Sequence, residues 1–333
     1  MNLPLSSAIF TCLTTTLPAL DYSGIDSTKY LGPVVIEATV TSEKYFTEGP
    51  AMDAHGNVFF TNTGEILKFS PKTKALEVFR KPSTANGSCF DAQGRLMNCE
   101  AGDGTNGRVT RTDLQTGKIE VLSHAFGGFP LGGPNDLTID SKGHIYFTSR
   151  LANTDPAKGN VNAVYRIDPD GKTARILAAP EIDMPNGLAV SPDEKTFYLI
   201  EADGREGRSR NIRAYDLQAD GSVTNMRVLV DLSPGRSGDG MELDEQGNLY
   251  VAAGLYKQRG TSETLDTRPG LHVFSPQGKL LAFVETPEDT VTNCAFGGDD
   301  LRTLYITCGR HLLSVRTTIP GQPRYRVGAV AKQ

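Results

Sequence analysis

The sequence predicts an all-β protein, a six-bladed β-propeller built from four-stranded antiparallel blades. The first observation behind this prediction is a repeat, in which a polar or glycine-containing element runs into an apolar strand, a tight turn and a second apolar strand. Successive copies lie roughly 40 to 55 residues apart, which is the spacing of propeller blades. The second observation is the composition, because 35 glycines and 19 prolines in 333 residues are typical of short strands joined by turns. The six copies begin at Glu48, Asn86, Asn135, Asn186, Asp239 and Asn293.

Each copy contains the same hairpin. In the first copy an apolar strand at 58–61 follows the turn 53–57, and in the third copy a strand at 145–148 follows the turn 140–144. The turn residues supply a positive φ or a side-chain bond to the backbone, as tight hairpins require. A second strand pair, such as 66–69 with 76–79, lies between the copies. Two hairpins per repeat make a four-stranded blade, and six blades bury their faces against one another.

The two ends of the chain complete the predicted organisation. Residues 34–40 are expected to form an edge strand that closes the ring with the C-terminal blade. We therefore expect an N-terminal extension at 1–32, the propeller at 33–320 and a C-terminal tail at 321–333. A β-sandwich would explain the hairpins but not the sixfold period.

Charge and hydropathy narrow the classes of partner. A net charge of −5 provides no broad basic field for nucleic acid or anionic lipid, so we expect a small-molecule partner and a monomer or small homo-oligomer. No apolar stretch reaches the roughly 18 residues that a membrane span needs. The first twenty residues are mildly apolar with no Lys or Arg before Lys29, a weak match to a signal peptide that leaves the cytoplasm and the periplasm open.

The sequence lacks the residue patterns of several common metal-binding and catalytic sites. Five cysteines include no Cys-x-x-Cys pair, and for Cys294 and Cys308, which flank one predicted hairpin, buried thiols are favoured over a disulfide. The histidines are too few and too separated for a zinc triad, and no Gly-x-Ser-x-Gly elbow supports a serine hydrolase. The glycine-rich stretch 102–107 lacks the Lys-Ser/Thr of a phosphate-binding loop.

The six repeat residues indicate a metal site. In a propeller the inner strands surround a central channel and begin at one of its mouths, so these side chains should converge there. Two carboxylates and four amides offer only hard oxygen ligands, which suit Ca²⁺ best and Mg²⁺ or Mn²⁺ less well. The alternative interpretation is that Asn and Asp before Gly merely form turns. Glu48 argues against it, because Glu is a poor turn residue.

A resemblance to a known family rests on motifs whose order and spacing match along the chain. They are Glu48-Gly49-Pro50, Cys99-Glu100 with 108–111, 134–137, 185–188, 191–193, 239–241, 247–251 and 292–298. Together they resemble the gluconolactonase, senescence marker protein (regucalcin) and luciferin-regenerating enzyme family of six-bladed propellers, from about residue 45 to residue 316.

The resemblance implies a site as well as a fold. One divalent ion is expected at the channel mouth, Ca²⁺ first, with Zn²⁺, Mg²⁺, Mn²⁺ or Fe as alternatives. The implied ligands match Glu48, Asn186 and Asp239, with Asn135 as a fourth ligand or a substrate contact. The remaining two repeat residues are expected to face the substrate, and these are Asn86 and Asn293.

The chain is more similar to the bacterial gluconolactonases than to the animal proteins. The animal proteins usually carry Arg and Gly where this chain has Gly133 and Leu137. It also departs from the bacterial pattern, with Ala101 where His is usual and Ser149-Arg150 where Asp-Pro is usual. Arg150 directly follows a predicted inner-blade strand, so we expect it to contact a substrate hydroxyl or carboxylate.

The function implied is that of a metal-dependent hydrolase of carbohydrate metabolism that opens a sugar lactone such as gluconolactone. Asp239 is the best candidate to accept the proton of the attacking water, and Asn135 would orient the substrate oxygen. One alternative is a calcium-dependent aryl-ester or organophosphate hydrolase on the same scaffold. Another is a non-catalytic propeller that binds a partner. The strictosidine synthase branch, which uses a catalytic Glu in place of a metal, fits less well because Glu48 and Asp239 occur together.

Overall fold

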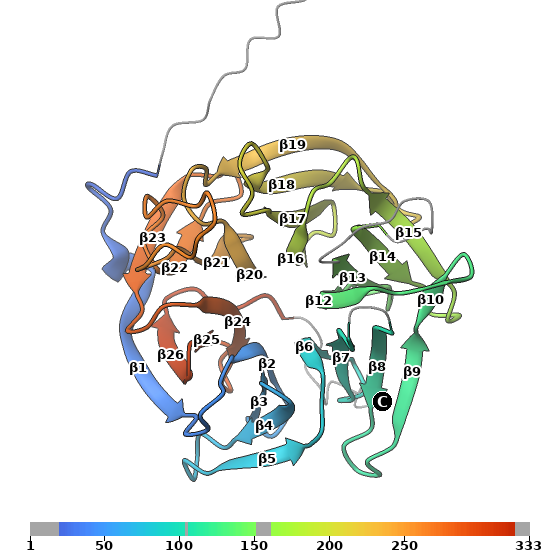
Figure 1. Ribbon diagram of the computed structural model, residues 1–333. Helices are drawn as coiled ribbons and strands as arrows, with labels where there is room; N and C mark the ends of the chain where they lie inside the picture. The colour runs from blue at the N-terminus through green and yellow to red at the C-terminus, as the bar shows by residue number, and fades with distance from the viewer. Residues whose placement is uncertain (1–19, 104–105, 151–160, 324–333) are drawn as a thin grey trace, which may run out of the picture.

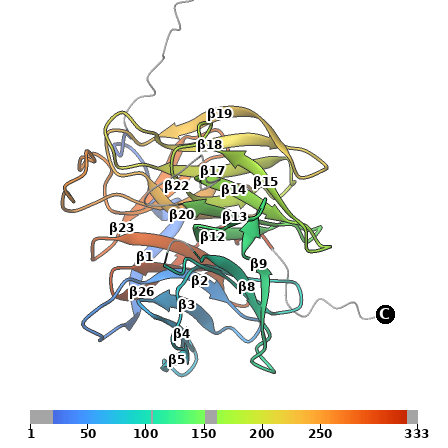
Figure 2. The same cartoon turned by 45° about the vertical axis from the view of Figure 1, so that its right-hand side comes forward.

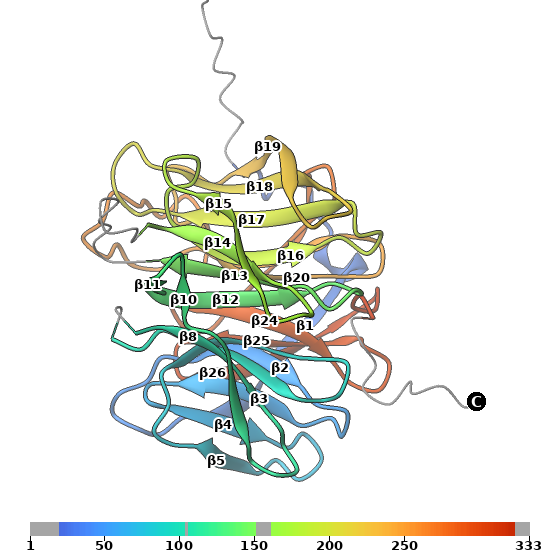
Figure 3. The same ribbon diagram turned by 90° about the vertical axis from the view of Figure 1, so that its right-hand side faces the viewer.

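The computed structural model describes residues 20–103, 106–150 and 161–323, and it confirms the six-bladed β-propeller (Figure 1). Six sheets of four antiparallel strands surround a central channel. Figures 2 and 3, turned by 45° and 90°, show the ring as a thick disc with blades 1 and 4 on opposite edges. The described residues include one short 3-10 turn, η1 (Ser27–Lys29), and no α-helix.

The strands of each blade follow one another from the channel outwards. Blade 1 consists of β2 (Glu48–Met52), β3 (Val58–Asn62), β4 (Glu65–Phe69) and β5 (Leu76–Arg80). Blade 2 consists of β6 (Ala85–Phe90), β7 (Leu96–Glu100), β8 (Arg108–Thr112) and β9 (Ile119–Ser123). Blade 3 consists of β12 (Gly133–Ile139), β13 (Ile145–Arg150), β14 (Ala163–Ile167) and β15 (Thr173–Ala178). Blade 4 consists of β16 (Pro185–Val190), β17 (Thr196–Ala202), β18 (Arg210–Leu217) and β19 (Val223–Asp231). Blade 5 consists of β20 (Gly238–Leu243), β21 (Leu249–Ala253), β22 (Gly270–Phe274) and β23 (Leu280–Glu285). Blade 6 consists of β24 (Val291–Gly297), β25 (Thr303–Cys308), β26 (His311–Thr317) and β1 (Leu31–Thr39).

The ring closes through the first strand of the chain. β1 pairs antiparallel with β26, for example Val35 with Ser314, so the predicted closing strand is confirmed. The segment before β1 packs on blade 5, where the Tyr22 hydroxyl lies 2.8 Å from His272 Nε2. Burial lowers the pKa of His272 to about 3, which keeps it neutral as a packing residue in β22.

The hydrophobic core lies between the blades. Each cluster of buried apolar side chains draws on two neighbouring blades, such as Leu199 of blade 4 packed with Tyr146 of blade 3. Free Cys294 and Cys308 belong to the cluster between blades 5 and 6, which confirms the expected buried thiols. Because every blade needs its neighbours to bury both faces, the inner strands are held side by side around the channel.

An Asp recurs in the inner hairpin turns of blades 1, 2, 3 and 5 and forms the same hydrogen bonds in each. In blade 2, Asp91 Oδ1 accepts the backbone N–H groups of Gln93 (3.0 Å) and Arg95 (2.9 Å). Asp53, Asp140 and Asp244 make the same two bonds in blades 1, 3 and 5. These Asx-type turns lie at the ends of the inner strands and fix the register of those four inner hairpins.

Two segments lie outside the blades. A short hairpin, β10 (Ala125–Phe126) with β11 (Phe129–Pro130), is inserted between blades 2 and 3. The segment after β26 docks on the end of blade 5, where Gln322 N–H donates to the carbonyl of Leu243 at 2.9 Å. Among the described residues we find no helix with the length and apolar character needed to cross a membrane.

Candidate active site

The six repeat residues all lie at the beginning of the innermost strands. Each is the first, second or third residue of its strand, and all are in strand conformation. The interpretation of these motifs as turn formers is therefore wrong. The residues and their strands are Glu48 in β2, Asn86 in β6, Asn135 in β12, Asn186 in β16, Asp239 in β20 and Asn293 in β24.

A local irregularity in the backbone directs these side chains. The pairing of every inner strand with its neighbour shifts register at the motif, for example between Pro185 and Leu188 in β16 and between Gly238 and Met241 in β20. The other four inner strands shift at the equivalent place. A β-bulge bends the strand and re-aims a side chain. Here it occurs in all six blades and surrounds the residues that meet at the channel.

In four of the six blades a glycine follows the motif residue, and in blades 4 and 5 this glycine makes room for the next blade. A Cβ built on Gly187 would lie 2.5 Å from the carbonyl oxygen of Asp239 and 2.8 Å from the Cα of Gly240. Gly240 in turn faces the side chain of Asn293, which a Cβ would overlap. Glycine is thus required because the inner strands approach one another closely, which brings the oxygen side chains of neighbouring blades within contact.

Replacing Gly187 with alanine should force β16 and β20 apart, because the added carbon meets backbone atoms that cannot move independently. Overpacking of this kind costs about 1–3 kcal/mol, so we expect Tm to fall by about 2–10 °C. Thermal unfolding with Gly32→Ala as the control checks this, since a Cβ on Gly32 meets its nearest atoms at an ordinary 3.5 Å. Equal Tm values for the two variants would contradict the close approach.

One group of site residues forms a hydrogen-bonded arc around the mouth. Asn186 Nδ2 donates to Asp239 Oδ1 at 2.7 Å. Arg236 Nη2 donates to the other oxygen, Oδ2, at 2.6 Å. On the other side of Asn186, Asn135 Nδ2 reaches Asn86 Oδ1 at 3.0 Å. The contacts of Asn186 and Arg236 orient both oxygens of the Asp239 carboxylate, and the contact of Asn135 with Asn86 joins blade 3 to blade 2.

Asn135 fits its surroundings better with its amide turned over. In that orientation its oxygen accepts from Arg150 Nε (3.2 Å) and Nη2 (2.9 Å), and its nitrogen lies 2.5 Å from Asn186 Oδ1 instead of facing Asn86. The arc then runs from blade 3 through blade 4 to blade 5. Amide orientation is assigned from the hydrogen-bond network, and this arrangement gives the oxygen a donor. Arg150, the last residue of β13, is thereby placed beside the predicted site.

A second group of site residues is joined by Asn293. Asn293 Nδ2 donates to Glu48 Oε2 at 3.2 Å and to Asp136 Oδ2 at 3.1 Å. Asp136 and Asn293 also line a cavity of about 120 Å³ that extends along the channel to Gln322 of the C-terminal segment. Among the described residues, no hydrogen bond joins Glu48 to Asp239, so the two groups are separate.

The electrostatics of the mouth favour a cation. Burial raises the pKa of Glu48 well above its ordinary value, and the nearby Asp239 and Asp136 carboxylates raise it further. Burial also raises the pKa of Asp136 to about 7. Buried carboxylates close enough to repel one another are costly unless a proton, a cationic side chain or a metal ion offsets their charge.

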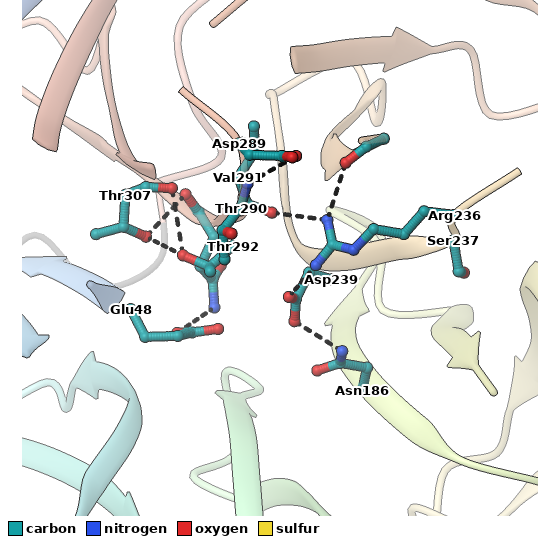
Figure 4. Close-up of polar contacts among 12 residues, drawn as sticks. Glu48, Asn186, Arg236, Ser237, Asp239, Asp289, Thr290, Val291, Thr292 and Thr307 are labelled. Carbon is teal, nitrogen blue, oxygen red and sulfur yellow. Dashed lines mark hydrogen bonds and ion pairs between the residues drawn. The ribbon is translucent and has the colours of Figure 1, made fainter. Parts of the chain in front are cut away.

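The residues present fit a divalent ion with a preference for oxygen. Figure 4 shows the Glu48, Asn186 and Asp239 side chains directed into the same central region from three blades. Asn186 uses its nitrogen to bind Asp239, which leaves its carbonyl oxygen as the ligand atom. Within residues 20–103, 106–150 and 161–323, no three His, Cys, Asp or Glu side chains form a metal-binding group. Two carboxylates and an amide are a hard oxygen set of the kind Ca²⁺ accepts.

Two residues of the mouth were not expected from the sequence. Asp136 belongs to a recognised motif, but nothing in its spacing distinguished it from a turn residue. Arg236 precedes β20 and is buried, and its Nη1 also donates to the carbonyl of Val291 at 3.0 Å (Figure 4). In the sequence, only the Arg-x-x-Asp spacing connects Arg236 with Asp239, and this spacing is too common to predict that the two side chains form an ion pair.

Comparison with known proteins agrees with this architecture. A gluconolactonase of Zymomonas mobilis is 28% identical over 308 residues, covering 84% of this chain and 80% of that protein. Regucalcin of Oryctolagus cuniculus is 31% identical over 286 residues, covering 84% of this chain and 88% of its own. The solved structure of a gluconolactonase from Xanthomonas campestris superposes with a TM-score of 0.70 at 28% identity, covering 85% of this chain and 89% of that one.

A second solved structure, of a putative gluconolactonase, has a TM-score of 0.73 at 26% identity and covers 88% of this chain and 96% of its own. The model of one family, described as the SMP-30/Gluconolactonase/LRE-like region, matches residues 46–310 and so includes all six inner strands. The chain therefore belongs to the SMP-30/gluconolactonase/LRE-like family.

Proposed function

We propose that the protein is a metal-dependent lactonase that opens a sugar lactone such as gluconolactone to its acid. The observation that carries this proposal is the meeting of Glu48, Asn186 and Asp239 at the channel mouth, buried and drawn from three blades. Relatives named gluconolactonase support the reaction class. An ester carbonyl must be polarised and attacked by water in this reaction, and the mouth offers groups for both tasks.

Glu48, Asn186 and Asp239 would hold the ion, which when bound supplies a Lewis acid that polarises the lactone carbonyl. We assign proton acceptance to Asp239. Asn186 donates to one of its oxygens and Arg236 donates to the other, so each oxygen keeps one lone pair outside these two hydrogen bonds. Water attacks the carbonyl carbon, its proton passes to the Asp239 carboxylate, and the ring carbon–oxygen bond breaks. The proton then passes to the departing ring oxygen, so the products are balanced.

The remaining predicted residues would bind the sugar. Asn135 and Asn86 lie next to the proposed ion ligands and offer amide groups to substrate oxygens. Asn293 is assigned the same role from blade 6, although its nitrogen is used by two carboxylates and its oxygen accepts from the N–H of Cys294. Arg150 approaches from β13 and would bind a hydroxyl or carboxylate of the substrate.

Replacing Arg150 with glutamine should raise KM by about tenfold to a hundredfold, because a hydrogen bond to a charged group contributes about 1.5–3 kcal/mol. We expect kcat to stay within about twofold, since a binding contact made equally in ground and transition states affects KM alone. Steady-state kinetics with gluconolactone measure both constants. Arg227→Gln is the matched control, because Arg227 forms an exposed pair with Asp216 on the outer strands of blade 4. A fall in kcat at unchanged KM would contradict the binding role.

Hydrolysis of a substrate panel tests the proposed function. The panel contains the glucono-, galactono-, xylono- and arabinono-lactones, one aryl ester and one organophosphate, each assayed with and without added Ca²⁺. Calcium-dependent opening of an aldonolactone is the expected result. Turnover of the aryl ester or organophosphate alone would favour the alternative hydrolase, and calcium binding without turnover of any substrate would favour a binding module.

A further inference from the structure

We infer that Arg236 is a positioning residue that orients Asp239 and weakens the hold of the site on its metal ion. The inference rests on the proposed function and extends it to a residue that is not itself a ligand. Arg236 Nη2 donates to Asp239 Oδ2 at 2.6 Å, a short charge-assisted contact between two buried side chains.

The position of the guanidinium is set by three elements. Its Nη1 donates to the carbonyl of Val291, the first residue of β24, at 3.0 Å (Figure 4). It also donates to the carbonyl of Gly254, just after β21, at 3.4 Å. The planar guanidinium reaches Asp239 with one nitrogen and both carbonyls with another. Arg236 therefore ties blade 5 to blade 6 and cannot follow the carboxylate if Asp239 rotates.

This contact completes the orientation of the carboxylate. Asn186 binds Oδ1 at 2.7 Å while Arg236 binds Oδ2, so rotation about the last side-chain bond of Asp239 would break two hydrogen bonds. A fixed carboxylate keeps its free lone pairs aimed in one direction, as a group that accepts a proton in the transition state requires.

The charge of Arg236 has a second consequence. A permanent cation at hydrogen-bond distance from a ligand oxygen repels a metal ion that uses the same carboxylate, and it withdraws electron density from that oxygen. The Asp239 carboxylate beside Arg236 would therefore donate less electron density to a bound ion, which would bind less tightly and keep more of its Lewis acidity. Arg236 thus lowers metal affinity and raises turnover together.

The test uses Arg236→Met, which keeps most of the side-chain bulk and removes the charge. With metal-stripped protein and calcium alone, isothermal titration calorimetry should show a dissociation constant about tenfold lower than wild type. With saturating calcium, kcat for gluconolactone should fall about tenfold or more at similar KM. Opposite effects on affinity and turnover distinguish this role from simple damage, which would weaken both.

Two further variants complete the design. Arg236→Lys keeps the charge but not the fork, so calcium affinity should stay within about twofold while kcat still falls severalfold. Arg166→Met is the control. It removes the ion pair of Arg166 with Asp168, which at 2.6 Å is as short as the pair of Arg236 with Asp239 but lies at the turn after β14 in blade 3. This variant should change neither the dissociation constant for calcium nor kcat. If Arg236→Met does not fold, Arg236→Lys decides the matter, because wild-type kcat in that variant would contradict the inference.

The outcomes separate this inference from the proposed function. Weaker calcium binding by Arg236→Met, or no change in either constant, would overturn the inference. If wild-type protein binds calcium but opens no lactone, the proposed substrate class fails, and the calorimetry still tests the effect of Arg236 on the ion. If wild-type protein binds no calcium, the metal-dependent function fails and this inference fails with it.

Discussion

Replacing Asp239 with asparagine should lower kcat by about 10²- to 10⁴-fold, the usual contribution of a general base. The amide keeps the size of the side chain and one ligand oxygen, but it cannot accept the proton of the attacking water. Calcium binding should weaken by about tenfold, because ligand charge sets much of the affinity of an oxygen site. Kinetics at saturating calcium, with calorimetry for the metal, separate the two effects.

The matched control is Asp91→Asn. Asp91 is as deeply buried as Asp239, but it serves a hairpin turn in blade 2, away from the channel mouth. This variant should lose thermal stability and keep kcat. Full turnover by Asp239→Asn under saturating calcium would reject Asp239 as the base and leave it only a ligand role.

Removing divalent ions should abolish lactone hydrolysis and lower Tm by about 5–10 °C, as expected for an ion bound well above its dissociation constant. The physical reason for the loss of stability is that the buried Glu48 and Asp239 carboxylates repel one another when no cation lies between them. Dialysis against a chelator, followed by differential scanning calorimetry and the lactone assay, measures both changes. Adding Ca²⁺ should restore both more fully than adding Mg²⁺, because the amide and carboxylate set suits the larger ion.

Glu48→Gln is the companion variant for the metal experiment. It removes one of the two ligand charges and keeps the shape of the side chain, so the chelator should lower its Tm by clearly less than it lowers the Tm of the wild type. A chelator-induced shift of wild-type size in Glu48→Gln would place the ion elsewhere in the molecule. Unchanged lactone hydrolysis after complete removal of metal from the wild type would refute the metal-dependent mechanism.

The ring and the location of the mouth could be read from the sequence because repeats occupy equivalent places in a closed architecture. Once Glu48 and Asn186 are equivalent positions of two blades, both must lie at the start of an inner strand. Likewise, the closing strand was predictable because an unpaired apolar edge at 34–40 needs a partner, and it pairs with β26.

Most contacts within the mouth were not predictable, because they join residues of different blades that lie 49 to 245 positions apart in the chain. The role of Gly187 is an example, since an Asn-Gly pair in isolation is typical of a turn. Only the close approach of β20, with Asp239 O 2.5 Å from the place of a Cβ, explains why glycine is needed there. Arg236 is the stronger example, because its partners come from β20, from the loop after β21 and from β24.

The sequence by itself determined the propeller, its six blades and the set of oxygen side chains at the channel mouth. Periodicity is a local property of the chain, and equivalent positions in a closed ring must meet. The tertiary structure decided which of these side chains touch, how Asp239 is oriented and which cation stands beside it. Those outcomes depend on bulges, on close approach between neighbouring inner strands and on the burial of charge, none of which has a local pattern in the sequence.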